Sequence, residues 1–140
     1  MKLIGFFLIL FLLTVPITLS AESFATPKFI SCYDGDTCKF NLPNLPPVFG
    51  EKISVRLKGV DTPEIRGKCP SEKAMAKEAK TFVNQILSNA KKIELLDVER
   101  GKYFRLLVRI EADGKDLSAL LLEKELARPY DGGKREGWCQ

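Results

Sequence analysis

The sequence predicts one small α+β domain, and three observations support this prediction. Five short stretches alternate apolar and polar residues, which is typical of half-buried β-strands. A longer stretch, residues 71–89, repeats apolar residues at helical spacing. The chain has 140 residues, which is a usual size for a single domain.

Turns separate the expected strands. Asp34–Gly35 favours a tight hairpin turn between the first two strands. Residues 43–50 are expected to form a loop, because prolines and a glycine interrupt strand pairing there. A turn at 99–102 separates the last two strands. In chain order, the expected strands are 24–33, 37–42, 51–60, 92–98 and 103–111.

Helices complete the predicted domain. Pro70 precedes the first helix and Glu72 lies in its first turn, where an acid suits the positive end of the helix dipole. Asp116 can cap a second helix after the fifth strand. The tail from Pro129 onward is expected to be irregular. This order fits a five-stranded β-barrel of the OB type with two to three helices.

Residues 1–21 have the layout of a secretory signal peptide. Lys2 precedes an apolar run at 3–15, and small or polar residues follow up to the expected cleavage point. The rival interpretation is an uncleaved membrane anchor, because the apolar part approaches spanning length. The polar residues near its end favour the signal peptide. We therefore expect an exported protein, periplasmic or secreted, with a single domain at residues 22–140.

All four cysteines follow the signal segment. An even number of cysteines in a small exported domain predicts two disulfides. Cys32 and Cys38 flank the first hairpin turn and can face each other across it, so we expect the pairs Cys32–Cys38 and Cys69–Cys139. A zinc site is the alternative, but the sequence has no histidine and no Cys-x-x-Cys motif.

The missing histidine narrows the possible chemistry. It excludes a Ser–His–Asp triad, a Cys–His dyad and any histidine general base. Carboxylates, arginines, a lysine or a tyrosine must then carry any catalysis. The net charge of +4 falls to +3 once Lys2 leaves with the signal segment, which is compatible with a polyanionic partner.

The stretch 56–64, where an expected strand breaks into a loop, offers the most chemistry. It contains a cation, two carboxylates, and a hydroxyl with its carbonyl: Arg56, Asp61, Glu64 and Thr62. A phosphodiester-cleaving site needs a cation for the phosphate, oxygen ligands for a divalent metal and a carboxylate for a water proton. For each residue alone, the alternative is a solvated charge at an ordinary strand end.

Two further positions contribute to the same hypothesis. Turn chemistry accounts for Asp34, because an Asp side chain bonds to nearby backbone in turns, whereas Asp36 can be either a turn residue or a metal ligand. Strand alternation turns Arg56 and Arg105 away from the apolar face. We therefore expect both arginines to lie at the surface, outside the core, and to converge on one phosphate.

Three segments together resemble the thermonuclease family, whose type member is staphylococcal nuclease. They are Asp34–Gly35–Asp36–Thr37, residues 56–64 and Lys102–Tyr103–Phe104–Arg105. The tail at 127–133 is similar to that of exported bacterial members. The resemblance covers residues 28–139, which is nearly the whole expected mature chain.

The resemblance implies an OB barrel and a calcium-dependent endonuclease that hydrolyses DNA and RNA. The implied calcium ligands are Asp36, Asp61 and the Thr62 carbonyl. The implied catalytic groups are Arg56 and Arg105, which clamp the phosphate, and Glu64, which assists the attacking water. The implied substrate contacts are Lys102, Tyr103 and Tyr130.

The sequence also departs from the type member. Phe104 replaces a glycine, and the proline-rich loop and the cysteines are additional. The alternative function is a non-catalytic OB module that binds nucleic acid. Such a module has no need for the implied catalytic and metal-binding residues. DNA and RNA are the expected partners, no stable protein partner is implied, and we expect a monomer.

Overall fold

The computed structural model describes residues 26–139. The expected signal peptide at residues 1–21, with its rival interpretation as a membrane anchor, lies outside the described residues. None of the helices within 26–139 combines the length and the apolar character that crossing a bilayer requires.

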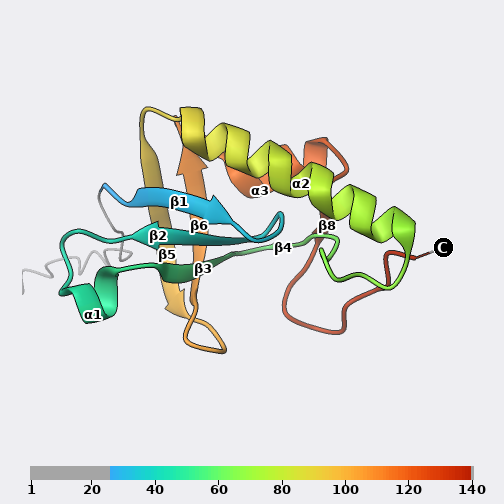
Figure 1. Ribbon diagram of the computed structural model, residues 1–140, viewed down its shortest axis with the longest axis horizontal. Helices are drawn as coiled ribbons and strands as arrows, with labels where there is room; N and C mark the ends of the chain where they lie inside the picture. Colours follow the sequence, from blue (N-terminus) through green and yellow to red (C-terminus); the bar gives the residue numbers. More distant parts are fainter. Residues whose placement is uncertain (1–25, 140) are drawn as a thin grey trace, which may run out of the picture.

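Five strands form one curled, mixed sheet that makes a half-barrel, as in OB folds (Figure 1). The spatial order is β1–β2–β3–β6–β5. β3 and β6 run parallel, whereas the other neighbours run antiparallel. The predicted α+β fold of the OB type is thus confirmed. The five strands are β1 (Lys28–Cys32), β2 (Thr37–Asn41), β3 (Ile53–Leu57), β5 (Ile93–Arg100) and β6 (Leu106–Ala112).

Three helices accompany the sheet. α2 (Pro70–Asn89) packs against β1, and α3 (Leu117–Glu123) packs against β6 (Figure 1). The Asp116 side chain caps α3 as expected, since its Oδ1 accepts a hydrogen bond from Ala119 N at 3.0 Å. The proline-rich stretch is not all loop, because it contains the short helix α1 (Pro47–Gly50) with a proline at its first position.

The tail is more ordered than the sequence indicates. β8 (Arg128–Pro129) pairs with β4 (Val60–Asp61), directly beyond β3. Tyr130 N extends this pairing with a 2.9 Å hydrogen bond to Gly59 O. A further short strand, β7 (Lys115–Asp116), pairs with β6. The expectation of an irregular tail is therefore wrong at this point, and the tail is attached to the loop that carries Asp61.

The last long strand begins later than expected. The sequence predicts a strand over 103–111, whereas β6 is Leu106–Ala112. Tyr103 and Phe104 have φ angles of 57° and 60°, so the chain turns through the left-handed region before the strand starts. Alternation of apolar residues does not reveal such a turn.

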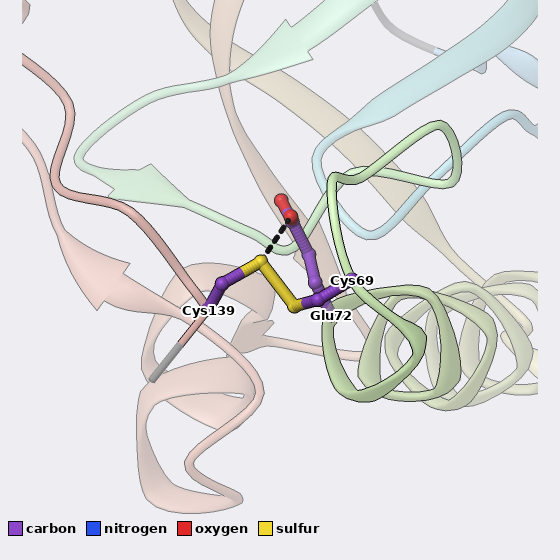
Figure 2. Close-up of side chains that lie close together, drawn as sticks. All are labelled: Cys69, Glu72 and Cys139. Atoms are coloured by element: carbon purple, nitrogen blue, oxygen red, sulfur yellow. Dashed lines mark hydrogen bonds between the residues drawn. A yellow bond between two sulfur atoms is a disulfide. The ribbon is translucent and has the colours of Figure 1, made fainter.

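Both expected disulfides are present. Cys32–Cys38 joins directly paired residues of β1 and β2. Cys69–Cys139 joins the start of α2 to the tail across 70 residues (Figure 2). The carboxylate of Glu72 points at this disulfide, with Oε2 3.4 Å from the Cys139 sulfur. The two sulfurs are bonded to each other, so neither is a thiolate that could bind zinc beside Glu72.

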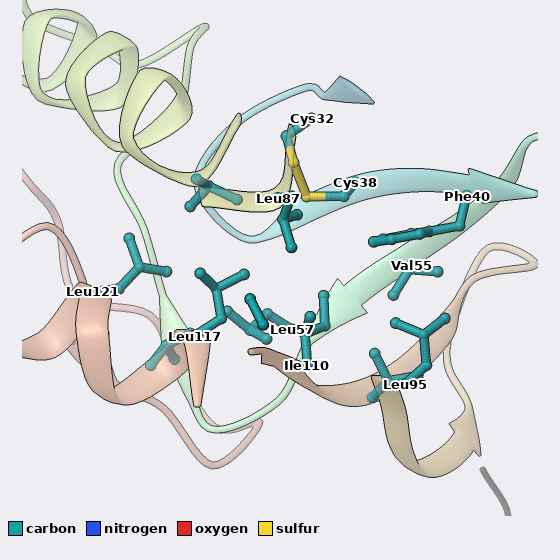
Figure 3. Close-up of a cluster of buried hydrophobic side chains, with 14 of the residues drawn as sticks. Cys32, Cys38, Phe40, Val55, Leu57, Leu87, Leu95, Ile110, Leu117 and Leu121 are labelled. Carbon is teal, nitrogen blue, oxygen red and sulfur yellow. A yellow bond between two sulfur atoms is a disulfide. The ribbon is translucent and has the colours of Figure 1, made fainter. Parts of the chain in front are cut away.

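The hydrophobic core fills the curl of the sheet and is closed by α2 and α3 (Figure 3). Burial of these apolar side chains is the main favourable contribution to folding. In α2 the buried apolar residues are Ala76, Ala79, Val83 and Leu87, whereas Met75 is half-buried. The largest buried members are Phe40, Val55, Leu57, Leu87, Leu95, Ile110, Leu117 and Leu121. This core fixes the end of β3, from which the candidate site begins.

Candidate active site

The turn between β1 and β2 buries two carboxylates. Asp34 Oδ1 accepts hydrogen bonds from the backbone of Asp36 (3.2 Å) and Thr37 (2.8 Å), which shapes the turn as expected. Gly35 allows close packing, because a Cβ there would lie 2.8 Å from Thr62 Cγ2. The turn therefore rests on Thr62, whose backbone N–H donates to Asp36 Oδ2 at 3.2 Å.

Arg56 connects this turn to β4. Its Nη1 lies 2.5 Å from Asp36 Oδ1, and its Nη2 lies 3.3 Å from Asp61 Oδ1. β-sheet register explains the placement, because Arg56 is paired with Thr37 on β2. Arg56 is only 9% exposed, so the expectation of a surface position is wrong. The strand alternation correctly turned it from the apolar core, but the turn and the tail cover it.

Asp61 and Thr62 follow from the short pairing of β4 with β8. Asp61 lies opposite Arg128 and is buried. Its Oδ2 accepts a 3.3 Å hydrogen bond from Trp138 Nε1. Thr62 Oγ1 is buried and has no hydrogen-bond partner among the described residues. An unsatisfied buried hydroxyl is costly, which suits a place where a further polar group can bind.

Glu64 is held through its backbone by a residue from α2. Its N–H donates weakly to Glu72 Oε1 at 3.4 Å, and Lys68 N donates to Glu72 Oε2 at 2.8 Å. Gly67 makes room for this carboxylate, since a Cβ there would lie 2.4 Å from Glu72 Cδ. The Glu64 side chain itself is 41% exposed, so it remains open to water. Glu72 therefore positions the loop that carries Glu64.

The tail covers the other side of the carboxylates. Arg135 Nε lies 3.1 Å from Asp61 Oδ1, and its Nη1 lies 2.5 Å from Glu64 Oε1. Tyr130 lies close to both guanidiniums. The centre of its ring is 6.0 Å from Arg56 Cζ and 5.8 Å from Arg135 Cζ. A cavity of about 450 Å³ opens here, lined in part by Asp61, Tyr130 and Arg135.

Burial changes the protonation of the two turn acids. Desolvation, together with the negative charges of Asp36 and Glu64, raises the pKa of Asp34 to about 7. Desolvation also raises the pKa of Asp36, although the neighbouring Arg56 acts in the opposite direction. An additional cation beside these groups would favour their ionised forms.

The loop between β5 and β6 lies apart from this cluster. Tyr103 is 86% exposed, Lys102 is exposed, and the guanidinium of Arg105 lies 5.6 Å from the Tyr103 ring. Within residues 26–139, Arg105 forms no ion pair with the carboxylates around Arg56. The expected convergence of Arg56 and Arg105 on one phosphate stays a prediction. Arg105 Nε is buried without a hydrogen-bond partner.

The cluster has the ligand set and the charge that a hard divalent cation requires. It contains four carboxylates and two guanidiniums, so full ionisation leaves an excess of negative charge. Carboxylate and carbonyl oxygens at flexible geometry are the ligands that calcium prefers. The unsatisfied Thr62 hydroxyl is consistent with the same conclusion. The charged members are Asp34, Asp36, Asp61, Glu64, Arg56 and Arg135.

Three residues of this site were not predicted from the sequence: Glu72, Arg135 and Trp138. Glu72 was assigned only to the first turn of α2. A signal for the other two was present, because the expected Cys69–Cys139 disulfide requires the tail to return to the start of α2. That start lies a few residues after Glu64, so the residues before Cys139 had to approach the site.

The structure thus combines an OB half-barrel with an arginine between two buried aspartates and an accessible glutamate beside them. The chain belongs to the family described as staphylococcal nuclease homologue, which matches residues 54–137. The match includes Arg56, Asp61, Glu64 and Arg105. The resemblance drawn from the sequence is thereby confirmed, and the family is generally one of nucleases.

Proposed function

We propose that this protein is a calcium-dependent endonuclease that hydrolyses phosphodiester bonds of DNA and RNA. A single observation supports the proposal: a network of ion pairs gathers two arginines, two buried aspartates and a water-accessible glutamate in a member of a nuclease family. The network consists of Asp36, Arg56, Asp61, Glu64 and Arg135.

Asp36, Asp61 and the carbonyl of Thr62 would hold the calcium ion. Asp36 and Asp61 are buried, and both form ion pairs with Arg56. The backbone N–H of Thr62 donates a hydrogen bond to Asp36. When bound, calcium neutralises phosphate charge and makes a bound water more acidic. Magnesium fits less well, because it demands stricter octahedral geometry and gives up its own water reluctantly.

Arg56 is the first proposed phosphate clamp. Its planar fork spans two carboxylates, and the same fork matches two oxygens of a phosphate. Because Arg56 is buried, a phosphate bound to it is partly removed from water, where charge stabilisation is stronger. Glu64 is the proposed acceptor of the proton from the attacking water, since it is the acid of the network with the most exposed side chain.

Arg105 is the second proposed clamp. Val55 is aligned with Leu106, the first residue of β6, so one further step along the parallel register would set Arg105 beside Ser54. Side chains two residues apart share a face of a sheet, which puts Arg105 on the same face as Arg56, about 7 Å along the strand. A phosphate oxygen would satisfy the buried Nε of Arg105. Binding requires its guanidinium to turn from the Tyr103 ring.

The exposed residues around the network are proposed to hold the nucleic acid. Lys102 can contact a phosphate of the strand, and Tyr103 beside it presents an open ring. Tyr130 lines the cavity next to Asp61 and offers a second ring. Aromatic side chains stack on nucleic-acid bases with little sequence preference, which suits a substrate range that includes DNA and RNA.

We further propose that the protein is exported, with residues 1–21 acting as a cleaved signal peptide, and that residues 22–140 work as a monomer. The two disulfides support export, because such bonds persist in oxidising compartments. Determining the mature N-terminus by mass spectrometry distinguishes the cleaved signal peptide from an uncleaved anchor.

The second candidate function is nucleic-acid binding without catalysis, which many OB domains perform. One experiment decides between the two functions. The purified mature protein is incubated with single-stranded DNA or with RNA, in calcium, in magnesium or in excess chelator. We expect hydrolysis in calcium, weaker hydrolysis in magnesium and none in chelator.

The matched control is Glu64→Gln, which keeps the size of the side chain and removes its proton-accepting charge. We expect this variant to bind DNA nearly as well as the wild type and to hydrolyse it on the order of a hundredfold more slowly. Binding without hydrolysis by the wild type in calcium would identify the protein as a binding module. Undiminished hydrolysis in chelator would exclude the proposed metal site.

A further inference from the structure

The tail places a guanidinium on the acids that the proposed reaction needs. Arg135 Nε lies 3.1 Å from Asp61 Oδ1, and Arg135 Nη1 lies 2.5 Å from Glu64 Oε1. Asp61 is a proposed calcium ligand, and Glu64 is the proposed proton acceptor. Arg135 therefore occupies oxygens on which two separate steps depend.

The tail is fastened on both sides of Arg135, so this contact is fixed by the fold. On one side, β8 pairs with β4. On the other, Cys139 is bonded to Cys69, and Trp138 is buried with its Nε1 donating to Asp61 Oδ2. Arg128 closes the segment, since its guanidinium lies 3.9 Å from the Trp138 ring centre and donates to Gly137 O at 2.9 Å.

The two positive groups compete for one carboxylate. Asp61 Oδ1 already receives Nη2 of Arg56 at 3.3 Å and Nε of Arg135 at 3.1 Å. A divalent cation at the same oxygen would meet the positive charge of both guanidiniums within a few ångströms. Arg56 is buried and has Asp36 as a second partner, whereas the Arg135 side chain is 40% exposed and can move into water. Arg135 is thus the group that can leave.

We propose that Arg135 is a positioning residue that acts as an internal counterion: it holds Asp61 and Glu64 in the metal-free protein and competes with calcium for them. This inference rests on the proposed calcium site. The Cys69–Cys139 disulfide keeps Arg135 at a high effective concentration beside the two acids. Arg135 thereby sets the calcium concentration at which the site fills, and it prevents the acids from repelling each other before then.

Calcium affinity, measured without substrate, tests this inference. The protein is the mature chain with both disulfides intact, and calcium is titrated by calorimetry and by the fluorescence of Trp138, the single tryptophan. Trp138 reports on changes at Asp61 because its Nε1 donates a hydrogen bond to Asp61 Oδ2. We expect Arg135→Gln to bind calcium about fivefold more tightly, since an exposed ion pair contributes up to about 1 kcal/mol.

Lys134→Gln is the matched control, because it removes one charge from the adjacent residue. Lys134 lines the same cavity, and it makes no ion pair within the described part of the chain. We expect its calcium affinity to stay within about twofold of the wild type. An equal gain for Lys134→Gln would overturn the inference, since the effect would then come from overall charge. An unchanged or weaker affinity for Arg135→Gln would overturn it as well.

Opening the disulfide gives an independent measurement. We expect the paired substitution Cys69→Ser with Cys139→Ser to raise calcium affinity, because Arg135 is then no longer held at the acids. Adding Arg135→Gln to that variant should bring little further gain, and a full additional gain would contradict the role of the disulfide. If the wild type bound calcium and Arg135→Gln matched it, only this inference would fail. If the wild type bound no calcium, the proposed function would fail with it.

Discussion

At the scale of single residues, Arg56 combines a proposed catalytic role with a place in the folded interior. It is buried between Asp36 and Asp61, whereas Arg105 is half-buried beside an exposed tyrosine. Substitution by lysine keeps the charge and removes the planar fork. The two arginines should therefore respond differently when stability is measured beside activity.

We expect Arg56→Lys and Arg105→Lys each to lower turnover on single-stranded DNA on the order of a hundredfold. Arg56→Lys should also lower stability by about 1–2 kcal/mol, because a lysine cannot reach both aspartates and leaves a buried acid poorly paired. Arg105→Lys should melt like the wild type. Turnover within about threefold of the wild type for both variants would show that the phosphate binds elsewhere.

Asp34 predicts a pH dependence of stability. Its pKa rises from an ordinary value of 3.8 to about 7 in the folded protein, mainly because it is buried. Between these values the folded state binds more protons than the unfolded state. The stability contributed by Asp34 is thus present at low pH and is lost as the pH rises through about 7.

Asp34→Asn removes this dependence while keeping an oxygen for the two turn hydrogen bonds. In chelator, we expect the variant to melt at a higher temperature than the wild type at pH 8, and by a clearly smaller margin at pH 5. Circular dichroism melts at the two pH values check this. A lower melting temperature at pH 8 would mean that the Asp34 charge stabilises the turn.

At the scale of elements, the loop from β5 to β6 contains a strained position. Phe104 has a φ of 60°, which is easily adopted only by glycine, and its ring is exposed. The left-handed conformation costs a non-glycine residue about 1–2 kcal/mol, and this is partly offset by the greater freedom of glycine in the unfolded chain.

We expect Phe104→Gly to stabilise the protein by up to about 1 kcal/mol, measured by denaturant unfolding. Phe104→Ala is the control, because it removes the same ring, including its contact with Arg100, but keeps a Cβ. The alanine variant should show no gain. A similar loss of stability in both variants would mean that the ring, and not the backbone, determines the stability of this loop.

Elements could be predicted where their signals were local. Alternation placed all five long strands, and Asp116 identified the start of α3. The errors fell where a tertiary contact determines the structure. β8 forms because it pairs with Val60 and Asp61, which are far from it in the sequence. The start of β6 was misplaced because the left-handed turn at Tyr103 has no glycine to mark it.

At the scale of the whole molecule, the two disulfides differ in accessibility and in loop length. Cys32 and Cys38 are buried, whereas Cys139 is exposed. The loop closed by Cys69–Cys139 has a sequence separation of 70, against 6 for the other pair. In the chain-entropy model these loops contribute about 4 and about 2 kcal/mol.

We therefore expect mild reductant to open Cys69–Cys139 first and to lower the melting temperature by about 10–20 °C while the half-barrel stays folded. Mass mapping of the alkylated cysteines beside a thermal melt checks the order. Opening of Cys32–Cys38 first, or an unchanged melting temperature, would contradict this account of the tail.

The candidate site was predictable in its composition and less so in its geometry. The motifs named Asp36, Asp61 and Glu64, and the structure brings these acids together through two guanidiniums. The sequence indicated neither the burial of Arg56 nor the position of Arg105, because both depend on how a loop and the tail fold back. The roles of Glu72 and Arg135 depend on tertiary contacts, so neither residue can be recognised from its local sequence.

The parallel pairing of β3 with β6 also has a kinetic consequence. It pairs Val55 with Leu106, and α2 and β5 lie between these residues in the sequence. The sheet can therefore close only after this intervening chain has folded back. The hairpin of β1 and β2, by contrast, pairs close neighbours in the chain. Long-range pairings form slowly because the intervening chain must first lose its freedom. We therefore expect the acidic turn to assemble early and the contact between β3 and β6 to form later.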